Sequence, residues 1–436
     1  MISALKGMKD LLSIEARLYE RVIKACESVA RNYGFEFIAT PHLELSALFK
    51  RSVGESSDIV GKEMYEFIDK GENSVCLRPE GTAGIVRAYI EHKFDKTQSV
   101  KRWFYHGSMF RYERPQKGRL REFHQFGVES FGVKSVFEDA TLILMLAQIL
   151  AKLDIKAKLK LNSLGCEKCL PEFRAKFLEF VSAKSDFCED CKRRKELNPI
   201  RMLDCKNEHC QGLLVGAPAL KECLCAECQS DFKSLQGLLS ANGVEFELDD
   251  KLVRGLDYYS KTAFEFESDE IGAKAAVAGG GRYDKLISYL GGKEGFGVGF
   301  AIGVERLMAI LAQKEQNNDE RDGIYLCALK EKYLKRLFTF ATDLRKAGNK
   351  VFLSYLHNKK PRWHLDNADL KKAQIFLCFG EYEVDKGTIY DSIKILGQPQ
   401  NSTKDIVQTI EQLEQSISQT KLVKVLEDLK NLENEL

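Results

Sequence analysis

Two absences stand out in this sequence of 436 residues: it has no excess of charge of one sign and no long hydrophobic run. Lysine and arginine total 66 against 64 aspartate and glutamate, which leaves a formal net charge of +2. The surface as a whole therefore cannot act as a general attractor of nucleic acid. Any binding of RNA must depend on local basic patches.

Segments that would direct the chain to a membrane are also lacking. The longest apolar stretch, Ala140–Ala151, is interrupted by Gln148 and is too short to cross a bilayer, so we expect a buried helix. The N-terminal segment has no apolar core of the length of a secretory signal. The sequence does not contain a P-loop motif for nucleotide binding either, because Val133 separates the glycine spacing of 127–132 from Lys134. We expect a cytoplasmic protein without a membrane partner.

The hydrophobic content of 44% and the charged content of 30% are typical of a soluble globular protein, and the length predicts two or three domains. The polar run 313–322 (QKEQNNDERD) is typical of a linker. Beyond it, strands at 323–329, 350–354 and 375–380 alternate with helices at 332–347 and 363–372, which predicts a mostly parallel sheet. Residues 323–410 carry 15 lysine and arginine against 9 aspartate and glutamate, so this lobe is basic.

Cysteine, by contrast, is abundant: there are 13, and nine fall between Cys166 and Cys228. Six of them form C-x-x-C pairs, namely Cys166 and Cys169, Cys188 and Cys191, and Cys225 and Cys228. Such pairs in a reducing compartment favour structural zinc, whereas a disulfide scaffold requires export. Two alternatives remain open. The cysteines form one or two four-thiolate sites, completed by Cys205 or Cys223, or they are reduced thiols in a small core. Spacing alone does not choose the pairing.

A basic hairpin is predicted between Ser108 and Ser130. Alternation over 104–111, a break at Pro115 and Gly118, and extension over 123–128 indicate a strand, a loop and a returning strand. The span carries five cationic side chains, Arg111, Arg114, Lys117, Arg119 and Arg121, followed by His124, Gln125 and Glu129. Because a guanidinium can hold two phosphate oxygens, the hairpin predicts a site for a polyphosphate beside a small polar ligand.

Several blocks of this sequence resemble class II aminoacyl-tRNA synthetases, and in particular the bacterial histidyl-tRNA synthetases. The blocks are Phe110–Glu113 (FRYE, motif 2), Leu252–Tyr259 (LVRGLDYY, a histidyl signature), Ala278–Asp284 (AGGGRYD, the second signature) and Gly299–Arg306 (GFAIGVER, motif 3). The predicted helix over 11–33 and the strand over 35–40 before Pro41 resemble motif 1, which implies a homodimer. The second catalytic part is predicted to end in a helix over 301–313, which includes the end of motif 3.

The resemblance implies an α+β class II catalytic domain, an antiparallel sheet flanked by helices, followed by a C-terminal α/β anticodon-binding domain. The expected parts are catalytic residues 1–164, a cysteine-rich insertion at 165–235, catalytic residues 236–315, an anticodon-binding domain at 323–415 and a helical tail at 416–436.

The reaction implied is a two-step charging of histidine tRNA with L-histidine, using ATP and Mg²⁺ and passing through histidyl-adenylate. Carried over residue by residue, the catalytic groups are Arg254 and Arg111. The histidine-binding residues are Glu80, Gly81, Thr82, Gln125, Glu129, Tyr258 and Tyr259. The ATP-binding residues are Arg111, Glu113, Arg119, Phe123 and Arg306, and the tRNA-binding residues are Arg114, Gln116 and Lys117.

A different class of function remains as the alternative. Histidine biosynthesis uses a synthetase-like regulatory subunit that binds histidine and charges no tRNA. Such proteins lack an anticodon-binding domain, whereas this chain retains Arg254, Arg306 and a basic C-terminal lobe. A zinc-dependent RNA-binding module would explain the cysteines but would leave the arginine and carboxylate residues without a role.

Overall fold

The computed structural model describes residues 2–54, 57, 59–97, 100–116, 119–254, 256, 258–270, 275–315, 321–346, 348–379 and 393–396. The chain divides into two compact units, residues 1–316 and 317–436, each of which is described by itself. The predicted helical tail at 416–436, the anticodon-binding domain beyond 396 and the tRNA-binding candidate Lys117 lie outside the described residues.

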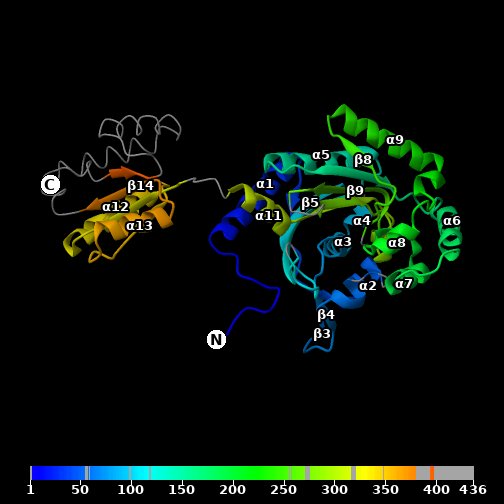
Figure 1. Ribbon diagram of the computed structural model, residues 1–436, viewed down its shortest axis with the longest axis horizontal. Helices are drawn as coiled ribbons and strands as arrows, with labels where there is room; N and C mark the ends of the chain where they lie inside the picture. Colours follow the sequence, from blue (N-terminus) through cyan, green and yellow to red (C-terminus); the bar gives the residue numbers. More distant parts are fainter. Residues whose placement is uncertain are drawn as a thin grey trace. The chain divides into compact units, whose positions relative to one another are not determined.

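Within the described residues, an eight-stranded sheet forms the centre of the first unit (Figure 1). Its spatial order is β1 (Glu36–Phe37), β5 (Lys101–Phe110), β6 (Glu122–Phe131), β11 (Gly297–Gly303), β10 (Ala275–Arg282), β9 (Ser260–Ser268), β7 (Lys158–Ser163) and β8 (Phe246–Leu248). The edge pairs β1–β5 and β7–β8 are parallel. The other pairs are antiparallel, as predicted.

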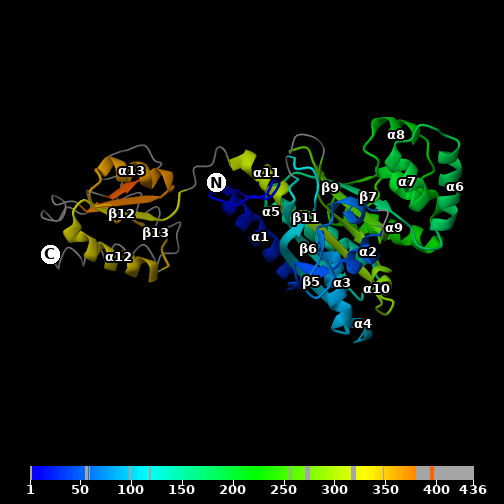
Figure 2. The ribbon, with the colours of Figure 1, turned by 90° about the horizontal axis from the view of Figure 1, so that it is seen from below.

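Four long helices cover one face of this sheet (Figures 1 and 2): α1 (Ile14–Asn32), α5 (Val136–Lys152), α9 (Ala226–Ala241) and α11 (Val304–Glu315). Residues three or four apart on α1 are fully buried, which agrees with the amphipathic spacing of the sequence; they are Leu18, Val22, Cys26 and Val29. They pack with Phe104 and Phe300 of the sheet into the largest hydrophobic core. This core fixes the strands that carry the site.

Smaller elements surround the opposite face of the sheet. They are α2 (Ser46–Val53), a π-helical turn (Ile59–Glu63), α3 (Thr82–Glu91), α4 (Phe94–Thr97), α10 (Leu286–Tyr289) and an antiparallel sheet in the order β2 (Leu43–Leu45), β4 (Ser74–Leu77), β3 (Glu66–Ile68). Ile85 and Tyr89 of α3 pack on Trp103 and Phe131 of the large sheet. The N-terminus of α3 consequently lies at the sheet surface.

The cysteine-rich segment forms helices between β7 and β9. They are α6 (Leu170–Ser182), α7 (Glu189–Leu197), a 3-10 helix (Pro199–Asp204), α8 (Glu208–Leu213), a second 3-10 helix (Leu220–Cys223) and then α9. Their core includes Phe173, Phe177 and Met202, together with Val253 and Ala263 from the catalytic part. The insertion and the signature peptide thus share buried side chains.

The second unit has a four-stranded sheet in the order β13 (Val351–Leu353), β12 (Ile324–Ala328), β14 (Ile375–Phe379), β15 (Ile393–Ile395), within the described residues. β12 is parallel to β13 and to β14, and β15 is antiparallel to β14. The helices α12 (Leu334–Lys346) and α13 (Pro361–Leu370) follow β12 and β13. The predicted alternation and the mostly parallel sheet are confirmed.

One predicted boundary is wrong. The helix expected over 301–313 begins only at Val304, because Ala301, Ile302 and Gly303 belong to β11. These three residues pair with β6, so their backbone is needed in the ladder. An apolar run of mixed small residues fits a strand as well as a helix, and periodicity did not separate the two.

Candidate active site

A cavity of about 280 Å³ opens on the face of the sheet opposite the long helices. Its walls come from the hairpin β5–β6, the start of α3, the signature peptide, strands β9 to β11 and the first turn of α11. Eleven of the predicted site residues line it: Glu80, Thr82, Arg111, Glu113, Arg119, Phe123, Gln125, Arg254, Tyr258, Tyr259 and Arg306. Four blocks that lie far apart in the sequence therefore meet at one site.

The floor of the cavity is flat because small residues line the strands there. Ala276, Gly279, Ala301 and Gly303 border the space, and a Cβ atom at Gly279 would overlap the Arg254 guanidinium. Larger side chains at these positions of β10 and β11 would fill the volume that a ligand needs. The glycine-rich blocks thus serve to keep the middle of the sheet open.

Three arginines give the hairpin side of the cavity its positive charge. The Nε atom of Arg111 donates to the Pro79 carbonyl at 2.9 Å, and its guanidinium lies 5.1 Å from the centre of the Phe123 ring. Arg306 donates to the Ala276 carbonyl, and Nη1 of Arg119 lies 3.4 Å from Oε2 of Glu113. Burial lowers the pKa of the Arg111 guanidinium and that of the Arg306 guanidinium below the usual value for arginine. Both guanidinium groups nevertheless stay charged at neutral pH.

Arg254 lies on the other side of the floor and is held in place by two neighbours. Its Nη1 atom donates to Oε2 of Glu265 at 2.5 Å, and the guanidinium lies 5.7 Å from the Tyr259 ring centre. Burial opposes the charged form, but Tyr259 and Glu265 outweigh it and raise the Arg254 pKa. Its Nε atom is buried without a hydrogen-bond acceptor among the described residues. This donor is available to a ligand.

The deep end of the cavity is built at the junction of β4 and α3. The Glu80 carboxylate accepts hydrogen bonds from the backbone N–H groups of Thr82 and Ala83, each at 2.8 Å, and so caps α3. Burial raises the pKa of Glu80, although these bonds oppose the shift. Across from it, Oε1 of Gln125 is buried and has no donor among the described groups. An acceptor left in this state suits a ligand ammonium or N–H group.

Glu129 lies behind the cavity wall and is only 1% exposed. It accepts from the hydroxyl of Thr82 at 2.7 Å, from that of Tyr105 at 3.5 Å and from that of Tyr283. Burial raises its pKa to about 8, although the Tyr283 and Thr82 hydrogen bonds lower it. The carboxyl group is therefore mostly protonated at neutral pH in the free protein.

The remaining predicted residues do not line the cavity. Gly81 instead gives room to Tyr105, since a Cβ atom there would overlap its ring. Arg114 and Gln116 are exposed in the hairpin loop, which is where contacts with a large partner are feasible.

Four residues around the site were not predicted. Tyr105 and Tyr283 surround Glu129, Glu265 holds Arg254, and Glu305 accepts from both the backbone N–H and Nδ1 of His124. Tyr283 falls inside the AGGGRYD block and Glu305 inside GFAIGVER, so those blocks carried a signal. For Tyr105 and Glu265 only strand alternation could have placed the side chain on the site face.

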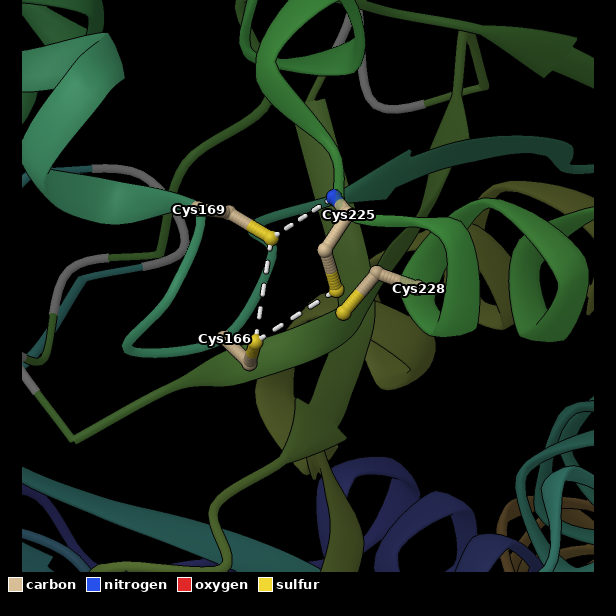
Figure 3. A group of neighbouring side chains, drawn as sticks. All are labelled: Cys166, Cys169, Cys225 and Cys228. Atoms are coloured by element: carbon tan, nitrogen blue, oxygen red, sulfur yellow. Dashed lines mark hydrogen bonds between the residues drawn. The ribbon is translucent and has the colours of Figure 1, made fainter.

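The cysteines of the insertion gather into two groups of four. Figure 3 shows Cys166, Cys169, Cys225 and Cys228 with their sulfur atoms turned toward one another. The second group consists of Cys188, Cys191, Cys205 and Cys210. Cys205 therefore joins a group as predicted, Cys210 is an additional member, and Cys223 lies in neither.

Comparison with known proteins agrees with this geometry. A model of the histidyl-tRNA synthetase family matches residues 7–307. A histidine–tRNA ligase of Campylobacter jejuni strain 81-176 is 69% identical over 390 residues, which cover 89% of this chain and 95% of the relative. The apo histidyl-tRNA synthetase of S. aureus superposes with a TM-score of 0.73 at 30% identity, covering 88% of this chain and 93% of that one.

A further structural neighbour shows the fold alone. It is an ATP phosphoribosyltransferase regulatory subunit/histidyl-tRNA synthetase from Bacillus halodurans C, with a TM-score of 0.63 at 20% identity, covering 87% of this chain and 98% of that one. The mixed sheet, its helices and the arginine-lined cavity define the catalytic unit of a class II aminoacyl-tRNA synthetase. Within that class, the chain belongs to the histidyl-tRNA synthetase family.

Proposed function

We propose that this chain activates L-histidine with ATP and transfers the histidyl group to histidine tRNA. The observation that carries the proposal is a cavity in which four arginines face a deep end built from a carboxylate, a hydroxyl and an amide oxygen that has no donor among the described residues. One end suits a triphosphate and the other a small zwitterion with N–H donors.

ATP is assigned to the hairpin side of the cavity. Arg111 holds the α-phosphate, Arg306 reaches the γ-phosphate and lies against adenine, and Arg119 helps the pyrophosphate. Phe123 covers the other face of the base. These groups come from the loop between β5 and β6, from β6 and from helix α11, and their meeting at one cavity supports the assignment.

Mg²⁺ that accompanies ATP would be held by the phosphates and Glu113. Of the described carboxylates that line the cavity, Glu80 and Glu305 are already engaged through both oxygens, and Glu265 is engaged with Arg254. Among the described residues the Glu113 carboxylate has a single contact, at 3.4 Å with Arg119, so it fits the ion best. The ion supplies neutralisation of phosphate charge.

Histidine is assigned to the deep end. Glu80, Thr82 and Gln125 bind the α-ammonium group, and Tyr258 forms a wall. The imidazole ring is assigned to Tyr259, which lines the cavity, and to Glu129, which lies behind the wall and would have to exchange one of its present hydrogen bonds for the ring N–H. A pocket that hydrogen-bonds both ring nitrogens rejects side chains without them, because its buried polar groups would lose their partners.

Activation needs no nucleophile from the protein. A carboxylate oxygen of histidine attacks the α-phosphorus, the bond to the bridging oxygen of the β-phosphate breaks, and pyrophosphate leaves with that electron pair. Arg254 stabilises the charge that develops on the five-coordinate phosphorus, since Glu265 and Tyr259 hold its guanidinium beside the cavity. The 3′-terminal ribose of the tRNA then attacks the carbonyl carbon, and AMP leaves.

Contacts with tRNA are assigned to the exposed loop residues Arg114 and Gln116, to Lys117, and to the basic second unit as an anticodon-binding domain. Lysine and arginine exceed acidic residues by six in 323–410, which suits phosphate contacts. We place the reaction in the cytoplasm, where tRNA is charged. Among the described residues, no helix has the length and apolar character to cross a membrane.

The active form is proposed to be a homodimer. Five large apolar side chains are exposed on β1 and on the two outer strands of the small sheet: Phe37, Leu43, Leu45, Phe67 and Ile68. Exposed large apolar side chains favour an interaction surface, and Phe37 lies in the segment that resembles motif 1. Light scattering of the purified chain tests this, with a mass near twice 49.5 kDa expected. A monomer at micromolar concentration would contradict the dimer.

Exchange of labelled pyrophosphate into ATP tests the first step without tRNA. The proposal predicts exchange that depends on histidine and is not supported by other amino acids. The regulatory-subunit alternative predicts histidine binding without exchange. If the native chain showed no histidine-dependent exchange, the proposed activity would be refuted.

A further inference from the structure

We propose that the insertion at 165–235 holds two zinc ions, each in a tetrahedral site of four cysteine thiolates. The first site consists of Cys166, Cys169, Cys225 and Cys228 (Figure 3), and the second of Cys188, Cys191, Cys205 and Cys210. All 13 cysteines of the chain are free thiols. The metal count does not depend on the synthetase activity, so the two proposals fail separately.

The spacing of the sulfur atoms fits one ion in each group. Four thiolates at tetrahedral corners, each about 2.3 Å from zinc, stand about 3.8 Å apart. The Sγ atom of Cys166 lies 3.7 Å from that of Cys169 and 3.8 Å from that of Cys225. In the second group, the Sγ atoms of Cys188 and Cys205 are 3.8 Å apart. Within each group all four sulfur atoms lie within 4.8 Å of one another.

Backbone N–H groups point at the sulfur atoms of both sites. The Cys225 N–H donates to Sγ of Cys169 at 3.2 Å, and the Cys188 N–H donates to Sγ of Cys210 at 3.3 Å. The Asn207 N–H lies 3.5 Å from Sγ of Cys205. Such donors stabilise thiolates and orient them, as the outer contacts of a metal site do. Ordinary buried thiols have no need of this arrangement.

The two sites occupy the places where a small domain needs support. The first joins Cys166 and Cys169, just after β7, to Cys225 and Cys228 at the start of α9, and so closes both ends of the insertion. The second connects α7, the 3-10 helix after it and α8. The insertion is short, near the size at which a hydrophobic core alone gives only marginal stability, and metal binding supplies folding energy in such domains.

The insertion also contacts the signature peptide 252–259, so the folding of the insertion affects the active site. Its core includes Val253, and Tyr259 packs against it. These residues flank Arg254 and the imidazole end of the cavity. The first zinc site is consequently expected to support the wall that positions Arg254, without contacting any substrate itself.

Elemental analysis of the full chain, purified under reducing conditions without chelator, tests the proposal. We expect two zinc ions per chain, about one after Cys169→Ser and about one after Cys191→Ser. Cys223→Ser is the matched control, because Cys223 is buried in the same core outside both groups, and it should retain two ions. Hydrogen exchange over 166–228 should increase on chelation while the β5–β6 hairpin stays protected.

The native chain decides the question even if a variant fails to fold. Replacement of the metal with Co²⁺ should give the intense sulfur-to-cobalt absorption of tetrahedral thiolate sites, with two ions bound. Zinc below about half an ion per chain that cannot be restored by added Zn²⁺ would overturn the proposal. Disulfides within the groups, iron in place of zinc, or equal metal loss in Cys223→Ser would overturn it as well.

Discussion

At the scale of single residues, the arginines of the cavity differ in what holds them. Arg254 is fixed by Glu265 and by the Tyr259 ring, whereas Arg119 is exposed and its guanidinium has, within the described part of the chain, one contact of 3.4 Å with Glu113. A preorganised charge needs no rearrangement when the transition state forms, so it contributes more to the rate than a mobile one. Arg254 is therefore the residue for which we expect the largest catalytic effect.

Replacing Arg254 with histidine should reduce histidine-dependent pyrophosphate exchange on the order of a hundredfold or more, the scale of one lost charge contact. The fold and ATP affinity should change little. Arg174→His, an exposed arginine on α6, serves as the control and should keep normal exchange. Near-normal activity in Arg254→His would remove the proposed catalytic role.

Glu129→Gln should weaken histidine binding far more than ATP binding, because we expect bound histidine to ionise the Glu129 carboxyl, which is mostly protonated in the free protein, and glutamine cannot provide that charged acceptor. Isothermal titration of both ligands measures the difference. Thr82, Tyr105 and Tyr283 hold the Glu129 carboxyl, and the amide oxygen of glutamine can still accept from them. Equal loss of both ligands would make Glu129 a structural residue.

The pH dependence of stability gives Glu129 a second readout. Its pKa is about 8 in the folded chain, and an unfolded glutamate titrates near about 4.3. Between these values the native state binds more protons, so the free energy of unfolding falls as pH rises. Thermal unfolding should show Glu129→Gln gaining stability relative to the native chain from pH 5 to pH 8.5. Parallel curves would contradict the raised pKa.

At the scale of elements, strand β10 shows how the sheet creates the site. Gly279 pairs with Glu265 of β9 and Ala301 of β11, and the Arg254 guanidinium lies over it. The strand register therefore places the arginine and its carboxylate partner side by side. A glycine at this point is required by the side chain that crosses it.

Gly279→Ala should displace the Arg254 guanidinium and lower the rate of exchange at least tenfold, with unfolding temperature nearly unchanged. Gly237→Ala is the matched control: a Cβ at Gly237 of α9 meets nothing within 4 Å, and alanine should stabilise this helix by about 0.5–1 kcal/mol. Steady-state exchange and thermal melts of both variants measure this. Full activity of Gly279→Ala would show that Arg254 does not depend on the floor of the sheet.

Sequence periodicity located most elements but not their partners. The apolar spacing of α1 and the alternation after residue 322 gave the helix and the parallel sheet, since both depend on local pattern. The sulfur groupings could not be derived, because Cys166 meets Cys225 only after the whole insertion has folded. The pairing of Arg254 with Glu265 could not be derived either, because it forms only once Glu265 is placed in strand β9 of the folded sheet. The end of β11 was missed because residues 301–303 suit either structure.

At the scale of the whole molecule, the two units divide the proposed work. The cavity lies entirely in residues 1–316, and the basic lobe belongs to the other unit. Deleting the chain after Asp322 should leave pyrophosphate exchange within about threefold of normal while tRNA charging is lost. Binding of tRNA by the full chain should weaken steeply with salt, because phosphate contacts release counterions. Unaltered charging by the truncated chain, or binding insensitive to salt, would contradict this division.

The central claim is that one cavity in this chain joins histidine to tRNA, and transfer of labelled histidine to histidine tRNA measures it directly. With ATP and Mg²⁺, the full chain should charge this tRNA with histidine and with no other amino acid, and Arg254→His should be slower by the factor found for exchange. Tight histidine binding by a folded native chain that transfers no label to tRNA would contradict the account.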